Sequence, residues 1–226
     1  MTEAFPFLEP LNSIPGVRAA WIGRIPGLAV SGNRDEAMQL LRPHHETAVS
    51  QFAGPSAQWW RAEQVHGNRV AVVPGSAQIT ALDGLSVVPH CDGLVTCQPG
   101  IVLAIYVADC GAIWMADRKT GTIGLLHSGS KGTESNILES ALTLMATQFG
   151  TEAKNVIAVL SPCIRVPDYQ IDFAGEIGRQ AASAGVGEFY DCGLNTASDA
   201  QLYYSYRREL GKTGRMMALV SRDLSL

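Results

Sequence analysis

Four short apolar runs follow one another in the middle of the chain. They cover residues 92–97, 101–107, 112–117 and 121–127, and turn signals interrupt them at Gln98–Gly100 and Lys119–Gly121. Each run has the length of a β-strand, and glycine and proline are typical of the connections between strands. Because strand follows strand here instead of alternating with helices, the pattern predicts an α+β fold and not a regular βαβ repeat.

Helical spacing flanks these runs. The clearest case is Glu134–Phe149, where apolar residues recur at helical intervals up to Gly150, a typical stop signal. The same reasoning predicts helices over 34–52, with a break near Pro43, over 172–184 and over 198–209, and strands over 58–66, 69–73, 156–160, 186–190 and 216–221. The length of 226 residues fits one domain with a mixed β-sheet and flanking helices.

Composition excludes several classes of partner. Seventeen basic and 21 acidic residues give a net charge of −4, which argues against nucleic acid or an anionic membrane as the main partner. The longest apolar runs are strand-sized, far short of about 20 residues for a membrane helix. With no export signal and an odd number of cysteines, five, we expect a cytoplasmic protein without a disulfide framework.

Three segments share one form, in which an apolar strand ends in a reactive side chain followed by glycine. The reactive side chains are His66, Cys110 and His127. Side chains at such strand ends project into clefts. Two imidazoles and a thiolate suit Zn²⁺ and leave a fourth tetrahedral position open, as in catalytic zinc sites. Spacings of 44 and 17 residues do not show that the three converge, and each histidine alone is more often structural.

Several sequence blocks, in order along the chain from about residue 58, resemble one family. The chain is similar to the YfiH-like family, long labelled multicopper polyphenol oxidase or laccase-domain, whose members are described as purine nucleoside phosphorylases with adenosine deaminase activity. Residues 1–55 diverge from the family pattern. The blocks are Gln64-Val65-His66-Gly67-Asn68-Arg69-Val70, Asp92-Gly93-Leu94-Val95-Thr96, Ala108-Asp109-Cys110, His127-Ser128-Gly129, Ser161-Pro162-Cys163-Ile164, Ser205-Tyr206-Arg207-Arg208 and Thr213-Gly214-Arg215.

The resemblance implies a single YfiH-like catalytic domain over residues 1–226, with zinc, in preference to copper, bound by His66, Cys110 and His127. It implies a purine nucleoside and phosphate as substrates, and we expect a monomer or small homo-oligomer. Beside the ligands, our candidate catalytic residues are Cys110, Asp109 and Lys131, and our candidate substrate-binding residues are Gln64, Asp92, Arg207 and Arg208. Asp109 could orient a metal-bound water or cap a strand, Asp92 could be a general base or a turn residue, and Lys131 or Arg207 could hold phosphate.

One block departs from the family pattern. Where the family usually has HAGWRG, this chain has His127-Ser128-Gly129-Ser130-Lys131-Gly132. Lysine in place of arginine keeps the positive charge but loses the bidentate fork that arginine offers to phosphate.

Three other functions stay open at this point. One is a cysteine hydrolase with Cys110 as nucleophile and His127 or His66 as base, including removal of a wrong amino acid from a peptidoglycan precursor. Another is a copper-dependent polyphenol oxidase, although such enzymes need many histidines and this chain has five. The last is a non-catalytic metal-binding family member.

Overall fold

Two β-sheets packed face to face form the centre of the computed structural model, which describes residues 5–81 and 84–223. The four-stranded sheet has the order β1-β12-β7-β2 and the six-stranded sheet the order β11-β10-β8-β9-β6-β3. The strands of the first sheet are β1 (Val17–Ile22), β12 (Met216–Arg222), β7 (Ile101–Val107) and β2 (Gln58–Arg61). Those of the second are β11 (Glu188–Asp191), β10 (Val156–Leu160), β8 (Gly111–Asp117), β9 (Ile123–Ser128), β6 (Gly93–Thr96) and β3 (Val70–Val72).

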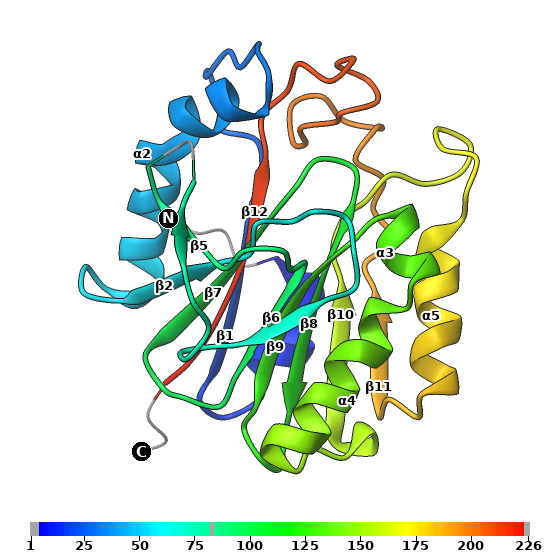
Figure 1. Ribbon diagram of the computed structural model, residues 1–226. Coiled ribbons are helices and arrows are strands. Elements are labelled where there is room, and N and C mark those ends of the chain that lie inside the picture. Colours follow the sequence, from blue (N-terminus) through cyan, green and yellow to red (C-terminus); the bar gives the residue numbers. More distant parts are fainter. Residues whose placement is uncertain (1–4, 82–83, 224–226) are drawn as a thin grey trace.

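Helices cover the outer face of each sheet, so the molecule has four layers (Figure 1). Helix α2 (Arg34–Ala53) packs on the four-stranded sheet, and α4 (Ile137–Phe149) and α5 (Phe173–Ser183) pack on the six-stranded one. The remaining elements are short: η1 (Pro6–Leu8), α1 (Glu9–Asn12), β4 (Ile79–Thr80), β5 (Ser86–Val87), α3 (Ser130–Glu134) and η2 (Ala153–Asn155). The predicted α+β class, with mixed sheets and flanking helices, is confirmed.

The largest hydrophobic cluster fills the layer between the two sheets. Trp21 of β1 and Trp114 of β8 meet there edge to face, with ring centroids 6.0 Å apart, and Trp114 donates a hydrogen bond to the carbonyl of Leu219 on the opposite sheet. Burying two indoles and satisfying an N–H across the layer fixes how one sheet sits on the other. Among the described residues, no helix is long and apolar enough to cross a membrane.

The predicted break at Pro43 is wrong, since α2 runs through it. Proline removes one main-chain donor, but buried residues on both sides of it, among them Met38 and Val49, pack the helix onto the sheet. A capping box at Asn33 and Glu36 satisfies the first N–H groups of the helix. Tertiary packing therefore outweighs the local signal.

Three other expectations also need correction. The predicted helix over 134–149 is divided, because Asn136 adopts a left-handed conformation (φ 52°) and caps α4. Residues 198–209 form turns, because side-chain acceptors such as Asp199 and Glu209 bind main-chain N–H groups there in place of helical carbonyls. Strands 58–66 and 69–73 are shorter than predicted and enter different sheets as β2 and β3.

Candidate metal centre and cleft

Antiparallel pairing brings Cys110 and His127 to the same edge of the six-stranded sheet. Ala112 of β8 lies opposite His127 of β9, and Gly111 lies opposite Ser128. Cys110 immediately precedes β8, so its side chain meets that of His127 where the two strands begin and end. His127 continues the face of β9 that carries Ile123 and Leu125, which are buried between the sheets. The two reactive groups therefore lie at one end of the inter-sheet layer.

The loop after β2 brings His66 to the same point. The side chain of Gln64 donates a hydrogen bond to the carbonyl of Tyr106 and accepts one from the Tyr106 N–H at 2.9 Å. Because Tyr106 lies near the end of β7, this amide fixes the loop against the edge of the four-stranded sheet. Gln64 and His66 both have left-handed main-chain angles (φ 64° and 65°), which non-glycine residues adopt when surrounding contacts hold them.

The ligand atoms of His66, Cys110 and His127 all lie within 4.8 Å of one another. A tetrahedral ion with bonds of about 2.0–2.3 Å needs its ligands roughly 3.5 Å apart, so small side-chain movements would close this set on one ion. The imidazoles of His66 and His127 stand nearly perpendicular, with centroids 4.8 Å apart. His127 is buried and His66 is exposed, so an ion bound here would face solvent on one side. The three residues thus form a cluster that could hold a metal ion.

Without a metal, the same residues form a charged pair. Burial opposes ionisation of the Cys110 thiol, but the imidazoles of His127 and His66 outweigh it and lower the thiol pKa from 9.0 to about 6. Burial also disfavours the imidazolium of His127, but Cys110 and Asp92 raise its pKa from 6.5 to about 9. Between these values Cys110 is a thiolate beside a positively charged His127, so one metal ligand is already deprotonated at neutral pH.

Asp109 holds the turn that presents Cys110. Its main chain is left-handed (φ 83°), and its carbonyl accepts the Ile164 N–H at 2.8 Å. Its carboxylate accepts the Thr196 hydroxyl and the Arg207 N–H, each at 2.7 Å. Asp109 therefore ties the turn at Cys110 to the loop that carries Arg207, and both of its oxygens already have donors.

The Cys110 sulfur occupies the space that a side chain at position 129 would fill. A Cβ added to Gly129 would lie 2.5 Å from Cys110 Sγ, closer than non-bonded atoms approach. The glycine after His127 is thus required by contact with the thiol, and its main-chain angle (φ −101°) is one that any residue can adopt.

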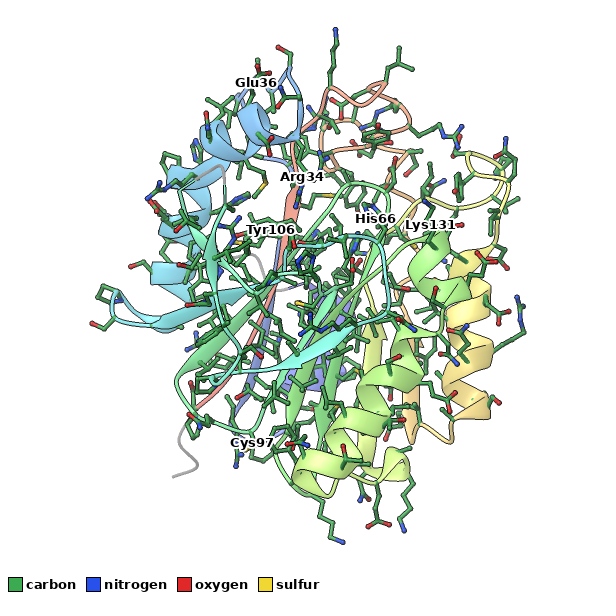
Figure 2. All side chains as sticks on the ribbon, viewed as in Figure 1. Arg34, Glu36, His66, Cys97, Tyr106 and Lys131 are labelled. Atoms are coloured by element: carbon green, nitrogen blue, oxygen red, sulfur yellow. The ribbon has the colours of Figure 1, made fainter. Side chains whose placement is uncertain are left out.

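A cleft with a volume of about 950 Å³ opens over the three ligands. Figure 2 shows Arg34, Tyr106, His66 and Lys131 across the upper half of the view, with His66 between Arg34 and Lys131. Among the described residues, the lining contains one carboxylate, Asp109, and four cations and four aromatic rings: Arg34, Lys131, Arg207, Arg215, Tyr106, Tyr169, Phe173 and Tyr206. The cleft is therefore positively charged in a chain whose net charge is −4.

Two of the cations are neighbours. Burial, and next the positive charge of Arg34, lower the pKa of the Arg215 guanidinium below its usual range. The described hydrogen bonds of both side chains go to main-chain carbonyls: Arg34 donates to Glu63, and Arg215 donates to Thr213 and Gly214. An anion placed between the two guanidiniums would relieve their mutual repulsion.

The candidate residues from the sequence divide into two groups. Seven of the nine line the cleft: Gln64, His66, Asp109, Cys110, His127, Lys131 and Arg207. Asp92 and Arg208 lie outside it. Asp92 is fully buried behind the histidines, and the Arg208 guanidinium donates to the carbonyls of Thr196, Ala197 and Tyr203.

Sequence reasoning missed Arg34 and the aromatic residues Tyr169 and Phe173. Arg34 follows the N-cap of α2, within the segment that resembles the family least, and no local signal marks it. Arg215 was not among the candidate residues either. It belongs to the Thr213-Gly214-Arg215 block, and its place in that block could have marked it as a residue of the cleft.

A family of known proteins matches most of this chain. The family described as "multi-copper polyphenol oxidoreductase laccase" matches residues 27–175 and 167–223. The chain belongs to this family. The match to this laccase family begins at residue 27, inside the N-terminal stretch in which the sequence blocks are hard to recognise.

Relatives of the chain within the laccase family are named purine nucleoside phosphorylases. The chain is 28% identical to the purine nucleoside phosphorylase YlmD of Geobacillus stearothermophilus, over 87% of this chain and 82% of that protein. It is 32% identical to a purine nucleoside phosphorylase of Deinococcus radiodurans, over 71% of this chain and 68% of that protein. The crystal structure of the hypothetical protein YfiH of Bacillus licheniformis has the same fold, with a TM-score of 0.77, 21% identity and coverage of 92% and 93% of the two chains.

We expect Cys110 to react with iodoacetamide at unusually low pH once metal is removed. Its alkylation rate, followed by peptide mapping between pH 5 and 9, should rise with a midpoint of about 6 and then level off, because the thiolate is the nucleophile. Cys91 and Cys192, whose thiol pKa burial raises to about 11, should stay unreacted over this range. A midpoint for Cys110 above pH 8 would contradict the thiolate–imidazolium pair.

Gly129→Ala should displace the Cys110 sulfur and weaken metal binding by at least about tenfold, measured by competition with a chromophoric chelator. Gly178→Ala is the matched control, since a Cβ there lies 3.4 Å from the Phe189 ring and far from the ligands. The control should bind metal as the unmodified protein does. Equal metal affinity in the two variants would show that contact between Gly129 and Cys110 is unimportant.

Proposed function

We propose that this protein is a zinc-dependent purine nucleoside phosphorylase that also deaminates adenosine. The observation that carries the proposal is the positively charged cleft over His66, Cys110 and His127, in a chain whose relatives are named purine nucleoside phosphorylases. Phosphate is a dianion, and a cleft with four cations and one engaged carboxylate suits it.

Phosphorolysis needs three things from the protein. Phosphate must be held near C1′ of the ribose, the purine must be oriented, and the leaving base must gain a proton. As a phosphate oxygen bonds to C1′, the bond between C1′ and the base breaks and its electron pair leaves with the base. Arg34 and Arg215, adjacent cations in the cleft, fit the first task. The rings of Tyr169 and Phe173, whose centroids are 6.1 Å apart, offer an apolar surface for the purine.

Zinc is the ion that we assign to the three ligands. One thiolate and two imidazoles are zinc donors, and three protein ligands leave one position open. Zinc bound there supplies Lewis acidity of the kind that deamination at C6 of adenine requires. A multicopper oxidase is disfavoured because it needs several histidine-rich copper sites and this chain has five histidines in total. Across the described residues, this is the one cluster of three or more potential metal ligands.

A cysteine hydrolase is the second candidate, because the pKa of Cys110 is low and His127 lies beside it. The two proposals differ in what metal removal does. Stripping zinc should abolish nucleoside turnover, whereas it should expose the thiolate of a cysteine nucleophile and raise hydrolase activity.

The decisive assay uses zinc-loaded protein with inosine or adenosine, with and without phosphate. We expect about one zinc per chain, release of free base that depends on phosphate, and ribose 1-phosphate in equal amount to the base. Ammonia released from adenosine without phosphate would report deamination. Fully loaded protein that releases neither base nor ammonia would refute the proposal.

Replacement of Arg215 by glutamine should raise the KM for phosphate by about 10- to 100-fold, because a hydrogen bond to a charged group contributes roughly 1.5–3 kcal/mol. The KM for the nucleoside should change much less. Arg118→Gln, at the opposite end of β8, is the control and should leave both values unchanged. If the nucleoside KM rises and the phosphate KM does not, Arg215 holds the nucleoside instead.

A further inference from the structure

Asp92 has a place in the structure that substrate binding does not explain. It immediately precedes β6, its side chain is 0% exposed, and it does not line the cleft. A carboxylate with no exposed surface cannot contact a substrate in the cleft. It is held inside the protein by its hydrogen bonds, since a buried charge needs donors around it.

Four donors surround the Asp92 carboxylate. Oδ1 accepts the His66 N–H at 2.8 Å and lies 2.9 Å from Nδ1 of His127. Oδ2 accepts the N–H groups of Val65 at 3.2 Å and Gly67 at 2.8 Å. One side chain therefore contacts both histidines of the metal cluster, one through its main chain and the other through its ring.

The bonds to residues 65–67 set the position of His66. Three consecutive N–H groups converge on the carboxylate, and this arrangement bends the loop back toward the sheet. His66 itself has a left-handed main chain (φ 65°), which is disfavoured unless neighbouring contacts hold it. Loss of the carboxylate would remove three such contacts at once and release the loop that carries this ligand.

The bond to His127 decides which ring nitrogen can bind metal. An ionised carboxylate only accepts hydrogen bonds, so Nδ1 of His127 carries the proton and Nε2 is left for the ion. A main-chain hydrogen bond joins the same two residues, since the His127 N–H donates to the Asp92 carbonyl at 2.7 Å. Asp92 thus holds both the backbone and the tautomer of this ligand.

We infer that Asp92 is a positioning residue that sets the geometry of both histidine ligands from behind the metal site. This inference rests on the proposed metal site but not on the nucleoside reaction. Metal affinity therefore tests it even if no nucleoside proves to be a substrate.

The chain offers a matched control in Asp117. It is also 0% exposed, and it also accepts main-chain N–H groups of a turn, those of Lys119 and Thr120. It ends β8 at the edge opposite to Cys110 and contacts no metal ligand. Asp92→Asn and Asp117→Asn are each isosteric and each remove one buried charge, so they should destabilise the fold in the same way.

The experiment compares zinc affinity, by chelator competition, with the Tm of the metal-free protein for both variants. Asp92→Asn should bind zinc about 10- to 100-fold more weakly, as is typical when the partner of a metal-bound histidine is lost. Its cobalt-substituted form should also lose the absorption of a tetrahedral thiolate site. Asp117→Asn should lower the Tm and leave the affinity and spectrum unchanged. Unchanged zinc affinity in Asp92→Asn, or an equal loss in both variants, would overturn the inference.

A second measurement covers the case in which Asp92→Asn does not fold. In zinc-loaded unmodified protein, ¹⁵N NMR of the histidine rings reports which nitrogen carries the proton. We expect a protected proton on Nδ1 of His127 and zinc on Nε2. Zinc on Nδ1 of His127 would be incompatible with the role of Asp92.

Discussion

Strands β6, β9 and β8 are buried neighbours that pair antiparallel in one register, in which Gly93 lies opposite Leu126 and Gly111 opposite Ser128. This register places the start of β6, the end of β9 and the start of β8 at the same edge. Asp92, His127 and Cys110 stand at those three points. Since side chains alternate along a strand, a slip of one residue in β9 would turn His127 away from Cys110 and move Ile123 and Leu125 out of the layer between the sheets. The core that fixes the register therefore also builds the candidate metal site.

Two aspartates extend this constraint into the loops through hydrogen bonds to their carboxylates. Asp92 takes N–H groups from the loop of His66, and Asp109 takes donors from Thr196 and Arg207. Both carboxylates are thus held by donors of the protein. The positive charge of the cleft comes from its lining, which has four cations and one carboxylate, in a chain that is acidic as a whole.

The sequence predicted the α+β class and the residues of most strands, because apolar runs and turn residues are local signals. It predicted the cluster of His66, Cys110 and His127 through the family blocks, since spacing alone did not show that they meet. It could not reveal Arg34, whose place beside Arg215 results from packing α2 on a distant sheet. The turns over 198–209 were missed for a similar reason, because their acceptors come from side chains such as Asp109 and Glu209.

Ser130 and Lys131 differ from the tryptophan and arginine that the family usually has at these positions. Both residues begin α3 and line the cleft, so the change lies at the site itself. Lysine keeps a positive charge there but loses the fork with which arginine binds two oxygens. Arg34 and Arg215 are arginines that line the same cleft, and their mutual repulsion favours an anion. In the proposed reaction, Arg34 and Arg215 therefore supply guanidiniums for phosphate although residue 131 is a lysine, and Lys131 adds a positive charge to the same cleft.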